Sequence, residues 1–269
     1  MAMDTAWLQD RFLAGIPLED ATGKPMPPVV LEATLASAKR FYTRTHGVLY
    51  EPTRVIVGAV PDAKCPANPD NEPEVTRPGI DYDLEGFKGS RWHSMNLPFG
   101  PVRSFDFVGL TYGTADTNII SFPPDWWRIG TKRWNLRLFP GNTSLKTENM
   151  SLASYVFTLG TPGTNRQVPQ GWAFYYRAGY TDIQAEEPDL ATAIGMKAIV
   201  GALPQIAMLN EGALSSESVS VDGLSQTRSY PTSAQAHRYS PLQTDFEKKL
   251  EAFNKSFFQT HRGVKFVSI

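Results

Sequence analysis

The stretch Gly171–Asn210, GWAFYYRAGYTDIQAEEPDLATAIGMKAIVGALPQIAMLN, changes from the pattern of a buried strand to the spacing of a helix. Its first part, Trp172–Tyr176, is a short apolar and aromatic run of the kind found in buried strands. Helical spacing begins at Pro188-Asp189, and Lys197 is the only clear charge in the rest of the stretch. A helix that is apolar on nearly every side is buried by neighbouring helices or by other subunits.

Two further segments repeat apolar residues at intervals of three and four, which is the spacing of amphipathic helices. The first begins at Pro27-Pro28 and ends at Gly47, and its apolar positions are Leu31, Leu35, Ala38 and Tyr42. The second begins near Pro241 and ends at Arg262-Gly263, and its apolar positions are Leu242, Phe246, Leu250, Phe253 and Phe257. Both ends of the chain therefore contribute helices.

Between the helical segments, short apolar runs alternate with turn residues, which is typical of strands. The expected strands are centred on Val55–Val57, Phe105–Thr111, Ile119–Ile120, Leu136–Phe139, Tyr155–Leu159 and Trp172–Tyr176. Residues 61–80 carry five prolines and few large apolar groups, which predicts a long loop. The middle third predicts an antiparallel sheet, arranged as a small sandwich or barrel.

Residues 211–240 are rich in serine and hold almost no large apolar side chains. Such a stretch cannot form a core, so we expect a long arm or an exposed loop with a bend at Asp222-Gly223. The final run, Val264–Val267, is strand-like. An extended tail of this kind can add a strand to the sheet edge of a neighbouring chain.

The predicted fold is α+β: a helical bundle of an N-terminal helix and two C-terminal helices, with an inserted antiparallel β-domain, an extended Ser-rich arm and a C-terminal tail. Residues 1–57 and 177–269 would form the bundle with its arm and tail, and residues 58–176 the β-rich insertion. The length of 269 residues suits one large domain or two small ones.

Composition excludes several classes of protein. The chain has 26 Lys and Arg against 27 Asp and Glu, and a net charge of −1 argues against nucleic-acid binding over the whole surface. The single cysteine, Cys65, excludes a disulfide within the chain and a cysteine-based metal cluster. No uninterrupted apolar run approaches the roughly 18 residues of a membrane span, so we expect no membrane partner.

Catalytic motifs are also missing from the sequence. The four histidines lie far apart, and neither a Gly-x-Ser-x-Gly elbow nor a phosphate-binding loop is present. We therefore expect no catalytic residue, no cofactor and no metal, and we expect that the protein is not an enzyme.

Three groups of residues leave other functions open. The carboxylates of Asp81, Asp83 and Glu85 could hold calcium or serve as a glycosidase acid and nucleophile. An aromatic sugar platform would come from Trp126, Trp127, Trp134 and Trp172. A nucleic-acid groove would use Arg91, Arg103, Arg128, Lys132, Arg133 and Arg137. A solvated acidic loop, an aromatic core and scattered surface charge are the favoured interpretations.

Several motifs resemble virion proteins of tailed bacteriophages. Their β-insertion is similar to Leu97–Ser104 (LPFGPVRS), Tyr112-Gly113, Phe122–Trp126 (FPPDW) and Leu136–Pro140 (LRLFP). Further segments of these proteins are similar to Tyr176–Tyr180 (YRAGY), Pro188–Leu190 (PDL) and Ser218–Gln226 (SVSVDGLSQ). The resemblance covers residues 97–269, with a weaker helical similarity at 27–57.

The chain thus resembles the head–tail connector (adaptor) proteins of the phage neck. The resemblance implies a non-enzymatic dodecameric ring that joins the portal to the tail, in a virion assembled in the bacterial cytoplasm. It implies as partners further copies of the chain, the portal protein and a downstream neck or tail-terminator protein, with DNA passing through unbound. The region 58–96 departs from compact connectors and leaves open a collar role with fibre proteins, or a place in the tail or baseplate.

The resemblance also implies that the C-terminal part docks against the portal. The docking residues expected on this basis are Phe253, Phe257, Arg262, Val264, Phe266 and Val267. The expected arm residues are Asp222, Gly223, Leu224 and Gln226. The alternative of a different class is a carbohydrate-binding or carbohydrate-active protein that uses the aromatic sheet and the acidic loop.

Overall fold

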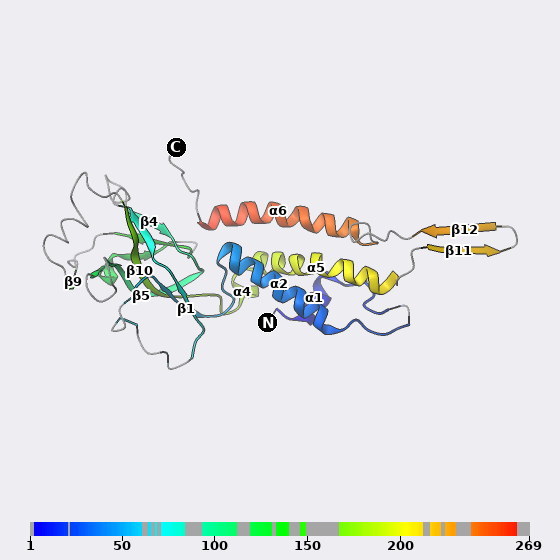
Figure 1. Cartoon of the computed structure of the whole chain (residues 1–269), viewed down its shortest axis with the longest axis horizontal. Coiled ribbons are helices and arrows are strands. Elements are labelled where there is room, and N and C mark those ends of the chain that lie inside the picture. Colours follow the sequence, from blue (N-terminus) through cyan, green and yellow to red (C-terminus); the bar gives the residue numbers. More distant parts are fainter. Residues whose placement is uncertain are drawn as a thin grey trace. The chain divides into compact units, whose positions relative to one another are not determined.

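The computed structural model describes residues 3–20, 22–60, 64–65, 68, 71–83, 93–111, 119–130, 133–139, 146–148, 167–211, 216–221, 224–229 and 238–262 (Figure 1). These residues form a mixed α+β protein with antiparallel sheets, as the sequence predicts. The chain divides into two compact units. The helical unit comprises Met1–Thr45 and Asp182–Phe258, and the β unit comprises His46–Thr181 and Gln259–Ile269.

The helical unit contains α1 (Thr5–Phe12), α2 (Pro28–His46), α4 (Ile183–Glu186), α5 (Pro188–Glu211) and most of α6 (Ser240–Arg262). The side chain of Asp4 caps α1 by accepting a 2.9 Å hydrogen bond from the Trp7 amide. Proline stands at the first position of α2 and of α5, where its missing N–H costs nothing. After α2, Gly47 has a φ of 66°, a left-handed conformation that commonly ends a helix.

Helix α5 lies at the core of the helical unit. Leu190, Ile194 and Leu203 are fully buried. A Cβ at Gly195 would lie 2.3 Å from the Phe12 ring, so the glycine allows α1 to approach closely. Neighbours within its own unit therefore bury much of this apolar helix. Among the described residues it is also the one helix long and apolar enough to cross a membrane, but half of that window is buried inside the protein, and core helices meet the same criterion.

Helix α6 packs through its aromatic face. The ring of Phe246 meets that of Phe12 edge-on at 6.3 Å between centroids, and the ring of Phe258 lies 6.2 Å from that of Tyr42. Tyr42 is fully buried, and its hydroxyl donates a 3.0 Å hydrogen bond to Oδ1 of Asn254. Burial raises the pKa of Tyr42 to about 12, although the hydrogen bond to Asn254 opposes the shift.

The raised pKa of Tyr42 predicts a loss of stability at alkaline pH. The unfolded chain releases this proton near pH 10.0 and the folded chain near 12, so stability falls as the pH rises through that window. The wild type should lose about 2 to 3 kcal/mol more than Tyr42→Phe between these pH values. Urea unfolding of both proteins at pH 9 and pH 12 measures the difference, and parallel pH profiles would contradict the prediction.

The β unit is built around β10 (Gln167–Ala178). This strand pairs antiparallel with β1 (Thr53–Val57), β5 (Val102–Thr111) and β3 (Ile80–Asp83). The seven-stranded sheet has the order β2-β1-β10-β5-β6-β9, with β3 also beside β10; it includes β2 (Glu74–Arg77), β6 (Ile119–Ser121) and β9 (Lys146–Glu148). A three-stranded sheet consists of β4 (His93–Asn96), β8 (Asn135–Leu138) and β7 (Trp127–Ile129), with the short 3-10 helix η3 (Pro124–Trp126) before β7.

Alternate residues of β10 enter two different apolar clusters, since successive strand residues point to opposite faces. Trp172, Phe174 and Tyr176 belong to the larger cluster. Tyr175 belongs to the smaller cluster on the other face, with Phe107 of β5. Both faces of this strand are therefore buried, which explains why its sequence is a continuous apolar run rather than an alternating one.

The structure corrects the sequence analysis in three places. The loop expected over residues 61–80 is wrong for Glu74–Arg77, which form β2 and pair parallel with β1. Strand β1 itself pairs with β10 in the β unit, whereas the expected boundary at residue 57 put it with the helices. The Ser-rich stretch contains the antiparallel strands β11 (Ser216–Val221) and β12 (Leu224–Ser229), which were not expected. The strand predicted at 155–159 and the tail after residue 262 lie outside the described residues.

Candidate functional site

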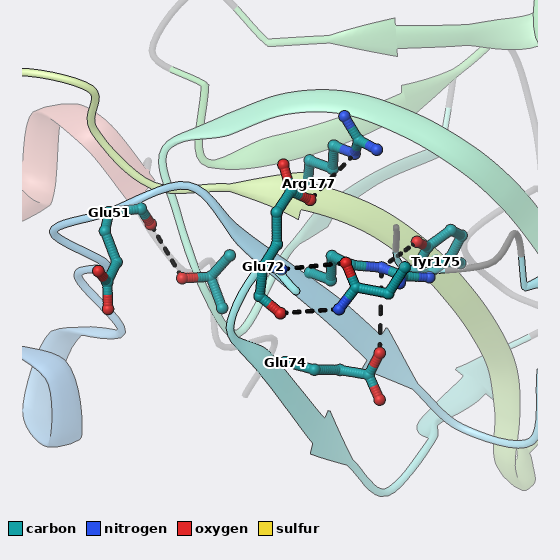
Figure 2. Close-up of polar contacts among 8 residues, drawn as sticks. Glu51, Glu72, Glu74, Tyr175 and Arg177 are labelled. Carbon is teal, nitrogen blue, oxygen red and sulfur yellow. Dashed lines mark hydrogen bonds and ion pairs between the residues drawn. The ribbon is translucent and has the colours of Figure 1, made fainter. Parts of the chain in front are cut away.

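A charged residue lies buried at the edge of the large sheet. Arg54 of β1 is only 3% exposed. Its Nε donates a hydrogen bond to the Tyr175 hydroxyl and lies 3.9 Å from Oε2 of Glu74, and its guanidinium carbon is 5.1 Å from the centroid of the Tyr175 ring. The strand register sets Arg54 opposite Glu74 of β2 on one side and opposite Arg177 of β10 on the other. Together with Glu72 and Asn68, these residues form the polar cluster, whose contacts are among those drawn in Figure 2.

The same cluster fixes the segment that leads into β2. The side-chain amide of Asn68 donates to the Glu72 carbonyl at 2.9 Å, and the Glu72 amide donates to Oδ1 of Asn68 at 3.0 Å. The Glu72 carboxylate lies 3.6 Å from Nε of Arg177 (Figure 2). The edge strand is thus attached by side chains to β1 and to β10, in addition to its backbone bonds with β1.

The polar cluster has balanced charge, with two arginines and two glutamates. Burial raises the pKa of Tyr175, although the hydrogen bond and charge of Arg54 oppose that shift. The phenol therefore stays protonated at neutral pH. Ion pairs and a neutral phenol supply no nucleophile. The contacts of the cluster instead position strand β2 against β1 and β10.

None of the sequence patterns predicts this cluster. A lone arginine within the apolar strand Thr53–Val57 was the available signal, because a buried charge requires a partner. The partner could not be named in advance, since Glu74 is 20 positions away in a segment with no strand pattern.

Replacing Arg54 tests the cluster. Arg54→Met keeps much of the side-chain volume but removes the charged hydrogen bond to Tyr175, which should lower the free energy of unfolding by about 1.5 to 3 kcal/mol. Arg177→Met is the matched control: its side chain is 45% exposed, and exposed ion pairs contribute about 0 to 1 kcal/mol. Urea titration compares the two variants, and equal losses would contradict a special role for the buried arginine.

The acidic residues left open as a calcium or glycosidase site are not brought together in the described part of the chain, where Asp81 and Asp83 lie in strand β3 and not in the favoured solvated loop. Oδ1 of Asp81 accepts a 2.9 Å hydrogen bond from the Gln170 amide, where β10 departs from its regular pairing with β3 and Gln170 has a φ of 52°. Asp81 therefore stabilises an irregular backbone turn. The side chain of Asp83 and all of Glu85 lie outside the described residues.

Two of the four tryptophans are unavailable as a sugar platform. Trp134 and Trp172 are 1% and 0% exposed. Trp172 stacks between Phe122 and Phe174, each at 5.5 Å between ring centroids. Trp126 and Trp127 are partly buried and pack against the larger apolar cluster. This arrangement is an aromatic core of the sheet.

The basic residues left open as a nucleic-acid groove have separate positions. Arg103 donates a 2.6 Å hydrogen bond to the Gly179 carbonyl. Arg128 and Arg137 are directly paired on β7 and β8, and both are exposed. Arg133 is exposed as well, while Arg91 and Lys132 lie outside the described residues. Within the described ranges, no group of three or more His, Cys, Asp or Glu is placed to hold a metal ion.

The expected docking residues fall in two places. Phe257 is 8% exposed and contacts the rings of Phe253 and Phe258, so its side chain packs within the helical unit. Phe253 is partly buried in the same stack, with 4.9 Å between its ring centroid and that of Phe257. Arg262 is the last residue of α6, and its side chain is not among those described. Val264, Phe266 and Val267 lie outside the described residues.

The expected arm residues lie at the turn of β11–β12. Val221 pairs with Leu224, so Asp222 and Gly223 are the two residues that join the strands, although they lie outside the described residues. Asp-Gly is a strong signal for a two-residue hairpin loop. Gln226 pairs with Val219.

Comparison with known proteins does not assign the chain to a family. No protein-family model matches the chain, and no curated protein matches it.

Proposed function

We propose that this chain is a non-enzymatic virion structural protein that forms a ring in the neck of a tailed phage. In this proposal, the ring is dodecameric, connects the portal to the tail and lets DNA pass. The helices form the bundle, the β unit forms the insertion, and the Ser-rich stretch with β11–β12 forms the arm. The end of α6 faces the portal, and a downstream neck protein binds on the other side.

The hairpin β11–β12 is the observation that carries the proposal. Among the described residues, it forms a two-stranded sheet with no third strand. It also bears the segment Ser218–Gln226, which resembles a segment of phage virion proteins. An isolated two-stranded hairpin is marginally stable in water, so we expect contacts with other chains to stabilise it.

Charge is compatible with this role. DNA that passes through a ring must not be retained, and a chain of net charge −1 does not supply the clustered cations that bind DNA. Retention on a DNA column that falls with salt would instead favour a nucleic-acid-binding protein.

Quantitative mass spectrometry of purified phage particles tests the proposal. Equal copy numbers of this chain and the portal protein are expected for matching rings. A several-fold excess would place the chain in the tail, collar or fibres. Absence from particles would overturn a structural role and favour the carbohydrate-related alternative.

A truncation supplies a second test. Removing residues 263–269 should abolish incorporation into particles while the helices of the remaining chain stay folded, as measured by circular dichroism. The matched control is the full chain with Ser268→Ala, which should incorporate normally. Normal incorporation of the truncated chain would contradict a docking role for the C-terminal residues.

A further inference from the structure

Strand β2 presents an open backbone edge. In its parallel pairing with β1, the carbonyls of Pro73 and Arg77 accept hydrogen bonds from Arg54 and Gly58, at 2.8 and 2.9 Å. Because strand groups alternate in direction, the N–H and C=O of Glu74 and Thr76 point away from β1. In the described part of the chain, these outward groups have no hydrogen-bond partner. Strand β2 is also terminal in the order of its sheet.

This edge is accessible. Glu72 and Glu74 lie within ion-pair distance of Arg177 and Arg54, at 3.6 and 3.9 Å. The side chains of Glu74, Thr76 and Arg77 are exposed, whereas Val75 is partly buried against the larger apolar cluster. An ordered edge of this kind is a template for an added strand.

We infer that the tail Val264–Val267 of a second copy of this chain adds to β2 as a further strand. Three properties of the tail fit the edge. It has four residues, as β2 does, and it is rich in the valine and aromatic residues that favour strands. Its residues also alternate, so that Val264 and Phe266 share one face and Lys265 lies on the other.

Charge and apolar character agree with this pairing. The segment 68–77 carries Asp70, Glu72 and Glu74 against Arg77, whereas the tail segment 260–269 carries Arg262 and Lys265 and no acidic side chain. With Lys265 on the Glu74 face, opposite charges meet across the strands. Phe266 then falls on the Val75 face, where it extends the larger apolar cluster.

The inference deepens the proposed function, because strand exchange from copy to copy is a heterologous contact, the kind that builds a ring when the rotation between copies closes. The inference rests on the proposed function in one respect: several copies of the chain must associate. It assigns Val264–Val267 to the next copy instead of the portal, so that only the end of α6 meets the portal and removing the tail breaks the ring itself.

Hydrogen exchange resolved to single amides tests the inference on full-length chains. A 15N-labelled Phe266→Pro chain lacks a competent tail of its own. Mixed with unlabelled wild-type chain at about 0.5 mM, or with the synthetic peptide 260–269 at about 1 mM, it should show at least about tenfold slower exchange at Glu74 and Thr76. A scrambled peptide of the same composition should leave exchange unchanged.

Two variants at one position provide the matched control. Thr76→Pro removes an outward N–H while the amides of Val75 and Arg77, which face β1, keep their protection and report an intact fold. It should abolish the protection at Glu74. Thr76→Ala retains the N–H and should behave as the wild type.

Each outcome decides the question. No protection from either the wild-type chain or the peptide would overturn the inference. A second result would also overturn the inference. If Glu74 and Thr76 of the wild type are protected at every concentration, but the labelled Phe266→Pro chain in the mixture is not, then the tail binds its own chain. Copy number in particles plays no part here, so failure of this inference and failure of the neck role are distinguished.

Discussion

Gly179→Ala is expected to lower the free energy of unfolding by about 3 to 5 kcal/mol, because a Cβ at this position has no space. It would lie 2.0 Å from the carbonyl oxygen of Glu51 and 3.2 Å from the nitrogen of Pro52. Backbone atoms cannot rotate away as a side chain can. The glycine also has a φ of 117°, which side-chain-bearing residues rarely adopt.

Neighbouring hydrogen bonds prevent the chain from yielding at Gly179. Its amide donates to the Pro101 carbonyl at 2.8 Å, and its carbonyl accepts a 2.6 Å bond from Arg103. The next amide, of Tyr180, donates to the Leu49 carbonyl at 3.1 Å. A shift large enough to admit a methyl group would break several of these bonds at once.

Gly15→Ala is the matched control. Gly15 has a φ of 82°, but no described atom lies within 4 Å of a Cβ built there. Only the left-handed strain remains, so the cost should be about 1 to 2 kcal/mol. Urea unfolding followed by circular dichroism measures both variants. Equal losses would show that backbone conformation, and not the clash with Glu51, sets the cost at Gly179.

Trp172→Ala should also cost about 3 to 5 kcal/mol, the usual range for removing a large aromatic side chain from a core. The indole is fully buried and stacks on both Phe122 and Phe174. Its removal leaves a cavity between the rings of Phe122 and Phe174. Phe174 is held by the pairing of β10 with β5, and the Phe122 amide donates to the Val108 carbonyl of β5 at 2.9 Å, so collapse around the cavity is limited.

Trp126→Ala separates a core role from a ligand platform. Trp126 is partly buried and lies 6.0 Å from Phe122 between ring centroids, so its loss should cost only about 1 to 2 kcal/mol. Unfolding curves and glycan-array binding are measured on both variants. Loss of glycan binding in Trp172→Ala with stability unchanged would contradict the core assignment and restore the sugar-platform hypothesis.

The long helices could be predicted closely from the sequence. The expected segments from Pro27-Pro28 to Gly47 and from Pro188 to Asn210 correspond to α2 and α5 within one or two residues. Their apolar residues recur at helical spacing, and proline or glycine marks the ends. The strands around Val55, Phe107 and Phe174 were likewise predictable, because their apolar runs are long enough to be distinguished from turns.

The hairpin β11–β12 was predictable in principle and was missed. Because serine is a weak strand former, the two polar segments around Asp222-Gly223 predict only an arm with a bend. The two strands are joined by a loop of only two residues, so their pairing costs little loop-closure entropy. This low cost outweighs the weak strand propensity of serine.

The α+β class, the ends of the helices and the apolar runs that become β1, β5 and β10 depend on local period and on residues a few positions apart, so they could be predicted from the sequence. Long-range contacts, by contrast, make Glu74–Arg77 a strand that pairs parallel with β1, and they bury Arg54 beside Tyr175 and Glu74. These features could not be predicted, because a short edge strand takes its conformation from backbone bonds to a distant partner. The apolar period and the strand propensity of Glu74–Arg77 (EVTR) do not indicate that β1 is this partner.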